Sequence, residues 1–302
     1  MGPSSGGTAV IIPARMLSSR FPGKLLHEVA GRSLLEWTYR RALAARGPAG
    51  VWIATDSPEI AQVAARFGAS VIHTGDHPSG SDRVAAAANL LWPNPRAVIN
   101  VQGDEPLIDP ELISRVCAAL ETPGGMSGEA PGEAPGEASG EKRGAKPEIV
   151  TCAAPFTGEA AWRDPSVVKV VTGANGRALL FSRAPIPYSR DRAPEDQFAG
   201  VRDHVRAHIG LYGYPLDLLQ RVVAAPPSSL EELESLEQLR ALEMGVPIRV
   251  LEVPVASAGV DTPSDLERVR PVLERERAAE ESGSRQRAAR EGDGPSPGNG
   301  RP

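Results

Sequence analysis

Short apolar runs alternate with longer segments of helical periodicity through the first third of the chain. The apolar runs cover residues 8–13, 51–55, 70–73 and 97–101, and helical patterns cover residues 33–45, 58–67 and 81–91 between them. This alternation predicts βαβ units, right-handed crossovers and an α/β fold with a mostly parallel sheet flanked by helices. In such folds the loops that follow the strands gather at one edge, where ligands bind.

The pattern after residue 148 contains more strands. It predicts a strand over residues 149–155, a hairpin over 167–182 that turns at Asn175-Gly176, and a strand over 208–214. Helices are expected at 216–223, from 228 to about 244 and at 263–273, with a strand at 248–253. Ser228 and Glu231 have the spacing of a capping box, and Gly245 is a typical helix stop.

Two segments lack the apolar content of a folded domain. Residues 123–147 contain the repeat GEAP-GEAP-GEAS-GEKR, and the chain from about residue 275 is charged and rich in Gly, Pro and Ser. Neither segment can bury enough apolar surface to offset the entropy lost on ordering. We therefore expect one folded domain over residues 1–274, with a disordered insertion at 123–147 and a disordered charged tail at 275–302.

Charge and cysteine content narrow the function classes. The chain has 33 Lys and Arg against 38 Asp and Glu, and its net charge of −5 argues against a nucleic-acid partner. Cys117 and Cys152 form no CxxC pair, so we expect both to be small buried residues. No stretch reaches the roughly 20 apolar residues of a membrane span, and the N-terminus has no signal-peptide pattern. A cytoplasmic protein without a membrane partner is therefore expected.

The stretch AVIIPARMLSSRFPGKLL at residues 9–26 carries the first candidate chemistry. An apolar strand leads directly into a loop that holds Arg15, Arg20 and Lys24 beside a Pro-Gly pair. Backbone N–H groups and fixed cations that converge in this way bind phosphate. The stretch does not match the Walker A pattern GxxxxGK[ST], because Leu25 follows Lys24. We therefore predict a phosphate site made mainly by side-chain cations.

Two acidic elements also follow predicted strands. Asp104 comes directly after the apolar run of VINVQGDEP, at the edge where the cationic loop lies. A carboxylate there suits an Mg²⁺ ion that bridges to a nucleotide, but an aspartate in a turn explains the sequence equally well. Asp261 in GVDTPSDL could also be a ligand, although this segment by itself favours capping of the last helix by Thr262 or Ser264.

Taken together, these segments resemble the bacterial 3-deoxy-manno-octulosonate cytidylyltransferases, the CMP-Kdo synthetases. The resemblance is carried by IIPARMLSSRFPGKLL, ATDSPEIA, HPSGSDRVA, VINVQGDEPLID, VVKVV, LLFSRAPIPYSRD, HIGLYGY, LESLEQLRALEMG and GVDTPSDLERV, in family order from residue 9 to about 269. It implies a Rossmann-like nucleotidyltransferase sheet, a smaller β-rich subdomain at about 156–226 for substrate binding and dimerisation, and a homodimer. The implied reaction transfers CMP from CTP to the anomeric hydroxyl of 3-deoxy-D-manno-octulosonate (Kdo) and releases pyrophosphate, for lipopolysaccharide biosynthesis.

The resemblance also implies roles for individual residues. The implied catalytic residues are Arg15 and Lys24, cations on the CTP triphosphate, and Asp104 and Asp261, which match the aspartates that hold Mg²⁺. Arg20 is a further cation on the nucleotide. The nucleotide side also includes Ser81, Asp82 and Arg83. The positions that match the Kdo pocket or lie close to the sugar are Gln102, Arg183, His208, Tyr212, Glu237 and Gln238.

Several of these residues have plainer interpretations in the sequence alone. Glu237 is typical of a solvated helix face, and Tyr212 is typical of a core or an interface. His204 and His208 have the i, i+4 spacing of a zinc pair on a helix, but His208 begins a predicted strand, which separates the two rings. Two other functions stay open: cytidylyl transfer to a related sugar such as 8-amino Kdo or sialic acid, and a non-catalytic nucleotide-binding module.

Overall fold

One nine-stranded sheet organises the chain, for which a computed structural model describes residues 6–16, 20–122, 147–255 and 258–292. Its seven central strands lie in the order β11 (Ile248–Glu252), β7 (Ile149–Ala154), β10 (Val205–Pro215), β6 (Ala97–Asn100), β1 (Thr8–Ala14), β4 (Gly50–Thr55) and β5 (Ser70–His73). The pairs β11–β7, β6–β1, β1–β4 and β4–β5 are parallel, and β10 is antiparallel to both of its neighbours. The predicted mostly parallel α/β sheet is confirmed.

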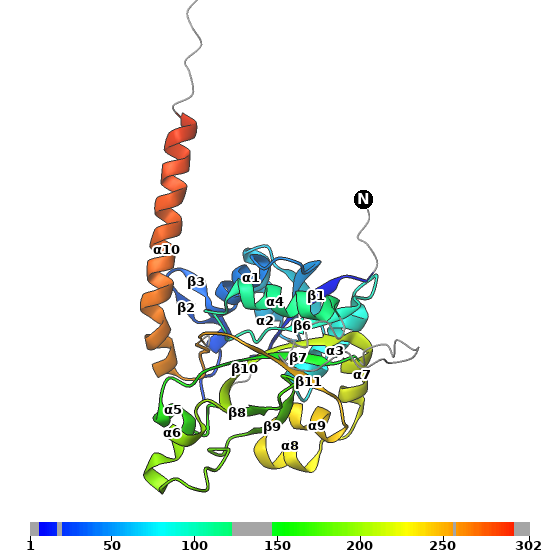
Figure 1. Cartoon of the computed structure of the whole chain (residues 1–302). Coiled ribbons are helices and arrows are strands. Elements are labelled where there is room, and N and C mark those ends of the chain that lie inside the picture. Colours follow the sequence, from blue (N-terminus) through cyan, green and yellow to red (C-terminus); the bar gives the residue numbers. More distant parts are fainter. Residues whose placement is uncertain (1–5, 17–19, 123–146, 256–257, 293–302) are drawn as a thin grey trace, which may run out of the picture.

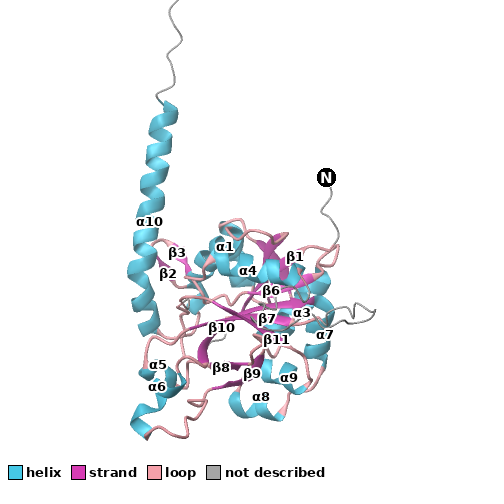
Figure 2. Ribbon diagram, in the orientation of Figure 1, coloured by secondary structure: helices cyan, strands magenta, loops and turns pink. Residues whose placement is uncertain are grey.

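Helices cover both faces of this sheet (Figure 2). Val10 and Ile12 of β1 pack in the cluster that includes buried residues of α1 (Leu34–Leu43), α2 (Pro58–Arg66) and α4 (Pro110–Glu121). Ala9 and Ile11 face the other cluster, with α3 (Gly80–Leu90) and α7 (Leu216–Ala224). Successive strand residues point to opposite faces, so the unbroken apolar run of β1 supplies both layers of the core.

Side-chain caps fix where the first helices begin. Ser33, Ser57, Ser79 and Asp109 each accept a hydrogen bond from a backbone N–H in the first turn of α1, α2, α3 and α4. Such caps satisfy donors that the helix leaves unpaired. Ser57 and Ser79 follow closely on β4 and β5, so the polar N-termini of α2 and α3 lie at the carboxyl edge of the sheet.

The predicted helix from residue 228 to 244 is wrong in one respect, because it is two helices. The capping box of Ser228 and Glu231 opens α8 (Ser229–Glu234), as expected, and α9 (Gln238–Glu243) follows. Ser235 between them has φ of 52°, a left-handed conformation that ends the first helix. Leu233 of α8 is exposed, whereas Leu236 and Leu239 after the break are buried.

The hairpin β8 (Lys169–Thr172) and β9 (Ala178–Ser182) extends the sheet from the first half of β10. Two short helices, α5 (Glu159–Arg163) and α6 (Gln197–Val201), pack there, and the one-turn helix η2 (Pro194–Asp196) directly precedes α6. Trp162 of α5 and Val201 of α6 form a small apolar cluster with Val205 of β10. They form the lower left of the molecule in Figure 1. Within the predicted subdomain of residues 156–226, β10 and α7 instead belong to the main sheet and core.

The predicted end of order at residue 275 is also wrong. Helix α10 (Pro263–Gly292) continues well past it and lies along one side of the molecule in Figure 1. Its Glu276 and Glu280 bind Arg41 of α1 and Arg32 of the short hairpin β2 (Glu28–Val29)–β3 (Arg32–Ser33), each pair at 2.6 Å. Ion pairs to the body of the protein hold a segment that buries little apolar surface. The rest of the predicted tail and residues 123–146 of the predicted insertion lie outside the described residues.

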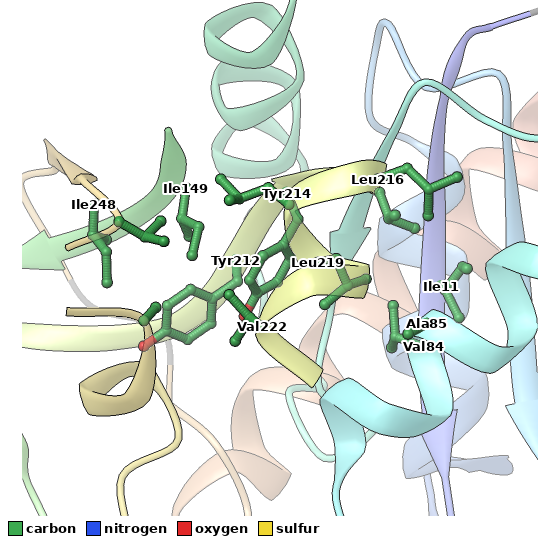
Figure 3. Packing of buried hydrophobic residues seen from close by; sticks show 14 of the residues in the cluster. Ile11, Val84, Ala85, Ile149, Tyr212, Tyr214, Leu216, Leu219, Val222 and Ile248 are labelled. Carbon is green, nitrogen blue, oxygen red and sulfur yellow. The ribbon is translucent and has the colours of Figure 1, made fainter. Parts of the chain in front are cut away.

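Buried side chains behave as the sequence indicated. Cys117 and Cys152 are buried and free, and burial raises the pKa of the Cys152 thiol to about 12. Figure 3 shows Tyr212 and Tyr214 within the larger apolar cluster, with Ile149 and Ile248 on one side and Leu219 on the other. Across the described ranges, no helix has the length and apolar content needed to cross a membrane.

Candidate active site

Two distant aspartates meet at the carboxyl edge of the sheet. Asp104 follows β6, and Asp261 lies just before α10. The backbone N–H of Val260 donates to the carbonyl of Asp104 at 2.9 Å, so the two segments are joined directly. At Gly259 a Cβ atom would lie 3.0 Å from the Glu105 carboxylate, so the small residue permits this close approach. The sheet edge and this backbone contact therefore bring the two carboxylates together.

The side chain of Lys24 lies between these carboxylates. Its Nζ donates to Asp104 Oδ2 at 2.5 Å, to Asp261 Oδ1 at 2.8 Å and to the carbonyl of Val260 at 3.0 Å. Burial by itself would lower the pKa of Lys24, but the charges and hydrogen bonds of the two aspartates outweigh it and raise that pKa. The resemblance implied a lysine on the triphosphate; in this structure its ammonium binds the carboxylates instead.

The local fold of the loop places Lys24 in this position. Gly23 has φ of 68°, in the left-handed region, and Lys24 begins the single turn η1 (Lys24–Leu26). Asp265 fixes the other partner, because its carboxylate accepts the backbone N–H groups of Asp261 at 3.0 Å and Thr262 at 2.8 Å. The Asp265 N–H donates in return to the Thr262 hydroxyl, so Thr262 caps α10, one of the two predicted choices.

The other two cations of the loop are exposed. Arg20 Nη2 lies 2.9 Å from Asp261 Oδ2. Arg15 lines a pocket with His77, Gly80, Arg83 and Gln102, directly after β1 and at the start of α3. Cations and a helix N-terminus at one opening suit a polyanion such as a triphosphate.

The aspartate pair fits a magnesium ion in its donor chemistry. Both carboxylates reach one atom, Lys24 Nζ, so their oxygens face a common point, and Mg²⁺ prefers oxygen ligands. Among the described residues no group of three or more His, Cys, Asp or Glu side chains gathers for a metal. Mg²⁺ is usually held by one or two carboxylates together with water and substrate phosphates, so two aspartates suffice.

The three residues predicted on the nucleotide side have different surroundings. The guanidinium of Arg83 is buried and binds Asp56 at 3.1 Å and Thr74 Oγ1 at 2.8 Å, which leaves it at the wall of the Arg15 pocket. Asp82 accepts a hydrogen bond from the hydroxyl of Ser79, the cap of α3. Ser81 lines a second pocket, with tyrosines and α9. Of these three residues, Arg83 alone lines the pocket of Arg15.

The second pocket collects three of the six residues predicted to bind sugar, Tyr212, Glu237 and Gln238. Its polar lining consists of Ser79, Ser81, Tyr212, Tyr214, Glu237, Gln238 and Arg240. The hydroxyl of Tyr212 is buried and has no hydrogen-bond partner among the described residues. Glu237 is exposed at the start of α9, as its plainer interpretation had it, yet it borders this pocket. Such an unpaired hydroxyl beside a carboxylate and an amide suits a ligand rich in hydroxyl groups.

Aromatic rings connect this pocket to His208. The ring centroids of Phe181 and His208 lie 5.1 Å apart, those of His208 and Tyr212 lie 5.3 Å apart, and those of Tyr212 and Tyr214 lie 5.8 Å apart. An irregularity of β10 between Ile209 and Tyr212 keeps these rings in contact. The sequence analysis did not predict Tyr214 as a site residue, although it lies two residues after Tyr212 and therefore on the same face of β10.

Thr151 of β7 sets the tautomer of His208 and was also missed. The Thr151 hydroxyl donates to the carbonyl of Leu211 at 2.9 Å, so it accepts from His208 Nε2 at 3.0 Å. This network assigns the proton to Nε2 and leaves Nδ1 as an acceptor. Burial lowers the pKa of His208 to about 3, so the ring is neutral at physiological pH. No sequence signal connects Thr151 to His208, because the contact depends on strand pairing.

Two further predicted residues lie at the borders of these pockets. Gln102 lines the Arg15 pocket and donates to Asn100 Oδ1 at 3.3 Å. Arg183, at the end of β9, directs its guanidinium to the carbonyls of Glu234 at 2.7 Å, Pro165 at 3.0 Å and Ser235 at 3.4 Å. The structure thus ties Arg183 to the turn before α9, next to Glu237.

Comparison with known proteins shows the family of the chain. The cytidylyltransferase family profile matches residues 9–248. Relatives named 3-deoxy-manno-octulosonate cytidylyltransferase occur in Anaeromyxobacter sp. strain Fw109-5, 45% identical over 88% of this chain and 96% of the relative, and in Geobacter sulfurreducens, 41% identical over 86% and 96%. The chain belongs to this family. The resemblance found in the sequence is therefore confirmed.

Solved structures agree with the fold of the family. The structure of CMP:2-keto-3-deoxy-manno-octonic acid synthetase complexed with CTP has a TM-score of 0.74 and 36% identity, covering 90% of this chain and 100% of that one. The 4-diphosphocytidyl-2C-methyl-D-erythritol synthase of Anaerococcus prevotii, at 13% identity and a TM-score of 0.55 over 89% of this chain and 99% of that one, shares the fold alone. The roles of individual residues remain predictions.

Proposed function

We propose that this protein transfers CMP from CTP to the anomeric hydroxyl of Kdo, with release of pyrophosphate. The observation that carries the proposal is the meeting of Asp104, Asp261 and Lys24 at the sheet edge, in a chain of the 3-deoxy-manno-octulosonate cytidylyltransferase family. The Arg15 pocket is suited to a nucleotide, and the pocket of Tyr212 and Glu237 is suited to a sugar.

The reaction needs alignment and charge stabilisation more than covalent help from the protein. In-line attack on a phosphorus atom leaves charge on the departing pyrophosphate. Arg15, Arg20 and Lys24 are the cations that would bind and stabilise this charge. Asp104 and Asp261 would hold Mg²⁺, which when bound neutralises phosphate charge and makes the attacking hydroxyl more acidic. We assign no general base.

Hydrogen bonds from several elements would orient the sugar. Nδ1 of His208 accepts, the Tyr212 hydroxyl donates or accepts, and Glu237 and Gln238 add a carboxylate and an amide. Arg183 has direct hydrogen bonds only to carbonyl oxygens from its guanidinium, so its charge has no ion-pair partner among the described residues. This charge suits the carboxylate of a keto-acid sugar.

A parallel assay tests the activity and the substrate. Purified protein, Mg²⁺ and CTP are incubated with Kdo, 8-amino Kdo or N-acetylneuraminate, and pyrophosphate release is followed in each. We expect the highest kcat/KM with Kdo. Preference for another sugar would replace the proposed substrate, and absence of release with all three sugars would refute enzymatic transfer.

Removal of either aspartate tests the proposed metal ligands. Asp104→Asn or Asp261→Asn should lower turnover at least about 100-fold, since one lost transition-state contact commonly costs about 2.7–4 kcal/mol. Asp203→Asn is the control, because that carboxylate is exposed and its ion pair with Arg202 is long, at 3.9 Å. Thermal unfolding shows whether each variant folds. Near-normal turnover in either folded site variant would mean that the ligand assignment is wrong.

Two further expectations belong to this proposal. The homodimer is supported by apolar exposure on the β8–β9 hairpin, where Leu179 is 65% exposed and Leu180 is 38% exposed. We do not place the contact on the LYGY segment of β10, because Leu211 and Tyr212 are buried in the middle of the sheet. The cytoplasmic location is supported by the supply of CTP there.

A further inference from the structure

The ammonium of Lys24 is fully committed to the proposed metal-binding carboxylates. An ammonium has three N–H donors, and Lys24 uses them on Asp104, Asp261 and the Val260 carbonyl. The residue is 9% exposed. No donor of Lys24 is therefore left for a phosphate while this arrangement persists.

The oxygens that bind Lys24 belong to the carboxylates proposed to hold the metal. Asp104 Oδ2 and Asp261 Oδ1 face Nζ at 2.5 and 2.8 Å. A divalent cation held by these oxygens would lie close to the ammonium, and the two positive charges would repel each other. Two carboxylates this close repel each other unless a cation lies between them. In this structure the ammonium of Lys24 is the cation between the two carboxylates.

We propose that Lys24 is a resident cation that competes with divalent metal for Asp104 and Asp261. The metal enters only when the ammonium leaves, and a triphosphate offers the ammonium new acceptors. This last step rests on the proposed function. The lysine has a flexible four-carbon stem, so its head can move between neighbouring anions without a change of fold. The protein thereby binds free metal weakly and takes it efficiently together with its nucleotide.

Removal of the ammonium should expose the competition. Mn²⁺ serves as the probe, and its free concentration is followed by electron paramagnetic resonance in the absence of nucleotide and sugar. Lys24→Gln should bind Mn²⁺ at least about tenfold more tightly than wild type, the gain expected if only one molecule in ten has free carboxylates. Mn²⁺ should also raise the melting temperature of this variant more than that of wild type.

Arg20→Gln is the matched control. Arg20 also pairs with Asp261, but it contacts one carboxylate only and its side chain is 59% exposed. This variant should gain much less affinity for Mn²⁺ than Lys24→Gln. The double variant Lys24→Gln, Asp104→Asn should lose the gain, because the metal would then lack one carboxylate.

The outcomes separate this inference from the proposed function. Equal Mn²⁺ affinity in wild type and a folded Lys24→Gln variant would overturn it, as would an equal gain in Arg20→Gln. The titration contains neither CTP nor Kdo, so its result does not depend on turnover. If wild type released no pyrophosphate, the transferase activity would be refuted. The Mn²⁺ titration would still decide whether Lys24 competes for the aspartates.

Discussion

A single threonine determines how His208 can act. The Thr151 hydroxyl has one proton and gives it to a backbone carbonyl, so His208 Nε2 must donate to it. The imidazole is then fixed as a neutral acceptor, with its ring against Phe181 and Tyr212. Enclosure of the ring opposes protonation, which would add a charge with no ionic partner. His208 is therefore suited to hydrogen bonding and not to charge-based recognition.

This environment gives stability a pH dependence with a definite sign. The pKa of His208 falls from 6.5 to about 3 because the ring is buried. Between these values the unfolded chain binds a proton that the native state does not, so the free energy of unfolding falls as the pH falls. At pH 5 this loss is about 2 kcal/mol, since one pKa unit corresponds to about 1.36 kcal/mol.

Urea unfolding at pH 7 and pH 5 tests this expectation. The free energy of unfolding of His208→Gln should fall less than that of wild type over this interval, by about 2 kcal/mol. His73→Gln, which removes an exposed histidine, is the control. Equal losses in wild type and His208→Gln would contradict the neutral, buried imidazole.

At the same scale, the sequence predicted which residues gather but not how they pair. Family order singled out Lys24, Asp104 and Asp261, and the structure brings these three side chains within hydrogen-bond distance. The direct contact of Lys24 with both carboxylates could not be foreseen, because it depends on the backbone contact between Val260 and Asp104. Arg183 likewise lies next to the expected pocket, but its carbonyl partners come from elements far away in sequence.

At the scale of elements, a buried ion pair joins α8 to α9, the helix that begins at the positions proposed to bind sugar. Arg240 of α9 makes two hydrogen bonds to Glu231 of α8, at 2.5 and 2.7 Å, and further bonds to carbonyls at the end of α7. The two side chains are only 10% and 11% exposed. Arg240 therefore fixes α9, and with it Glu237 and Gln238, as a positioning residue.

Substitution of Arg240 should affect sugar binding before nucleotide binding. Arg240→Lys keeps the charge but loses the paired geometry, so the KM for Kdo should rise about tenfold while the KM for CTP stays within about twofold. Arg240→Met leaves the buried Glu231 carboxylate without its cation, with the backbone N–H of Ser228 as a remaining partner, and should cost about 3–5 kcal/mol in urea unfolding.

An exposed pair provides the control for this substitution. Arg46 and Glu111 are 81% and 54% exposed, so Arg46→Met should cost less than about 1 kcal/mol and leave both KM values unchanged. Equal rises in the KM values for Kdo and CTP in Arg240→Lys would show a general structural effect. They would argue against a role in placing α9.

Element boundaries were predictable where local chemistry determines them. The strand over residues 70–73 was predicted with its observed bounds, and those of β1, β4 and β6 differ by one residue at one end. The capping box at residue 228 correctly predicted the start of α8. The break at Ser235 was missed, because its left-handed conformation has no glycine to signal it. The length of α10 was missed because its support comes from arginines in distant elements.

At the scale of the whole molecule, the sheet leaves one apolar edge uncovered. Within the part of the chain that the structure describes, strand β9 pairs only with β8, and its neighbouring residues Leu179 and Leu180 are both exposed. An exposed edge strand with apolar side chains invites pairing with another chain. Strand β10 cannot serve this purpose, because other strands pair with it on both sides. The hairpin is therefore the surface on which we place the dimer contact.

Light scattering coupled to gel filtration tests this placement. Wild type should have twice the mass of the 31.8 kDa chain, and Leu179→Glu should shift it toward the monomer, because a charge in an apolar contact loses its solvation. Leu90→Glu is the matched control, since Leu90 is 63% exposed on α3. A monomeric wild type would contradict the homodimer. Dissociation by Leu90→Glu alone would move the interface to α3, away from the hairpin.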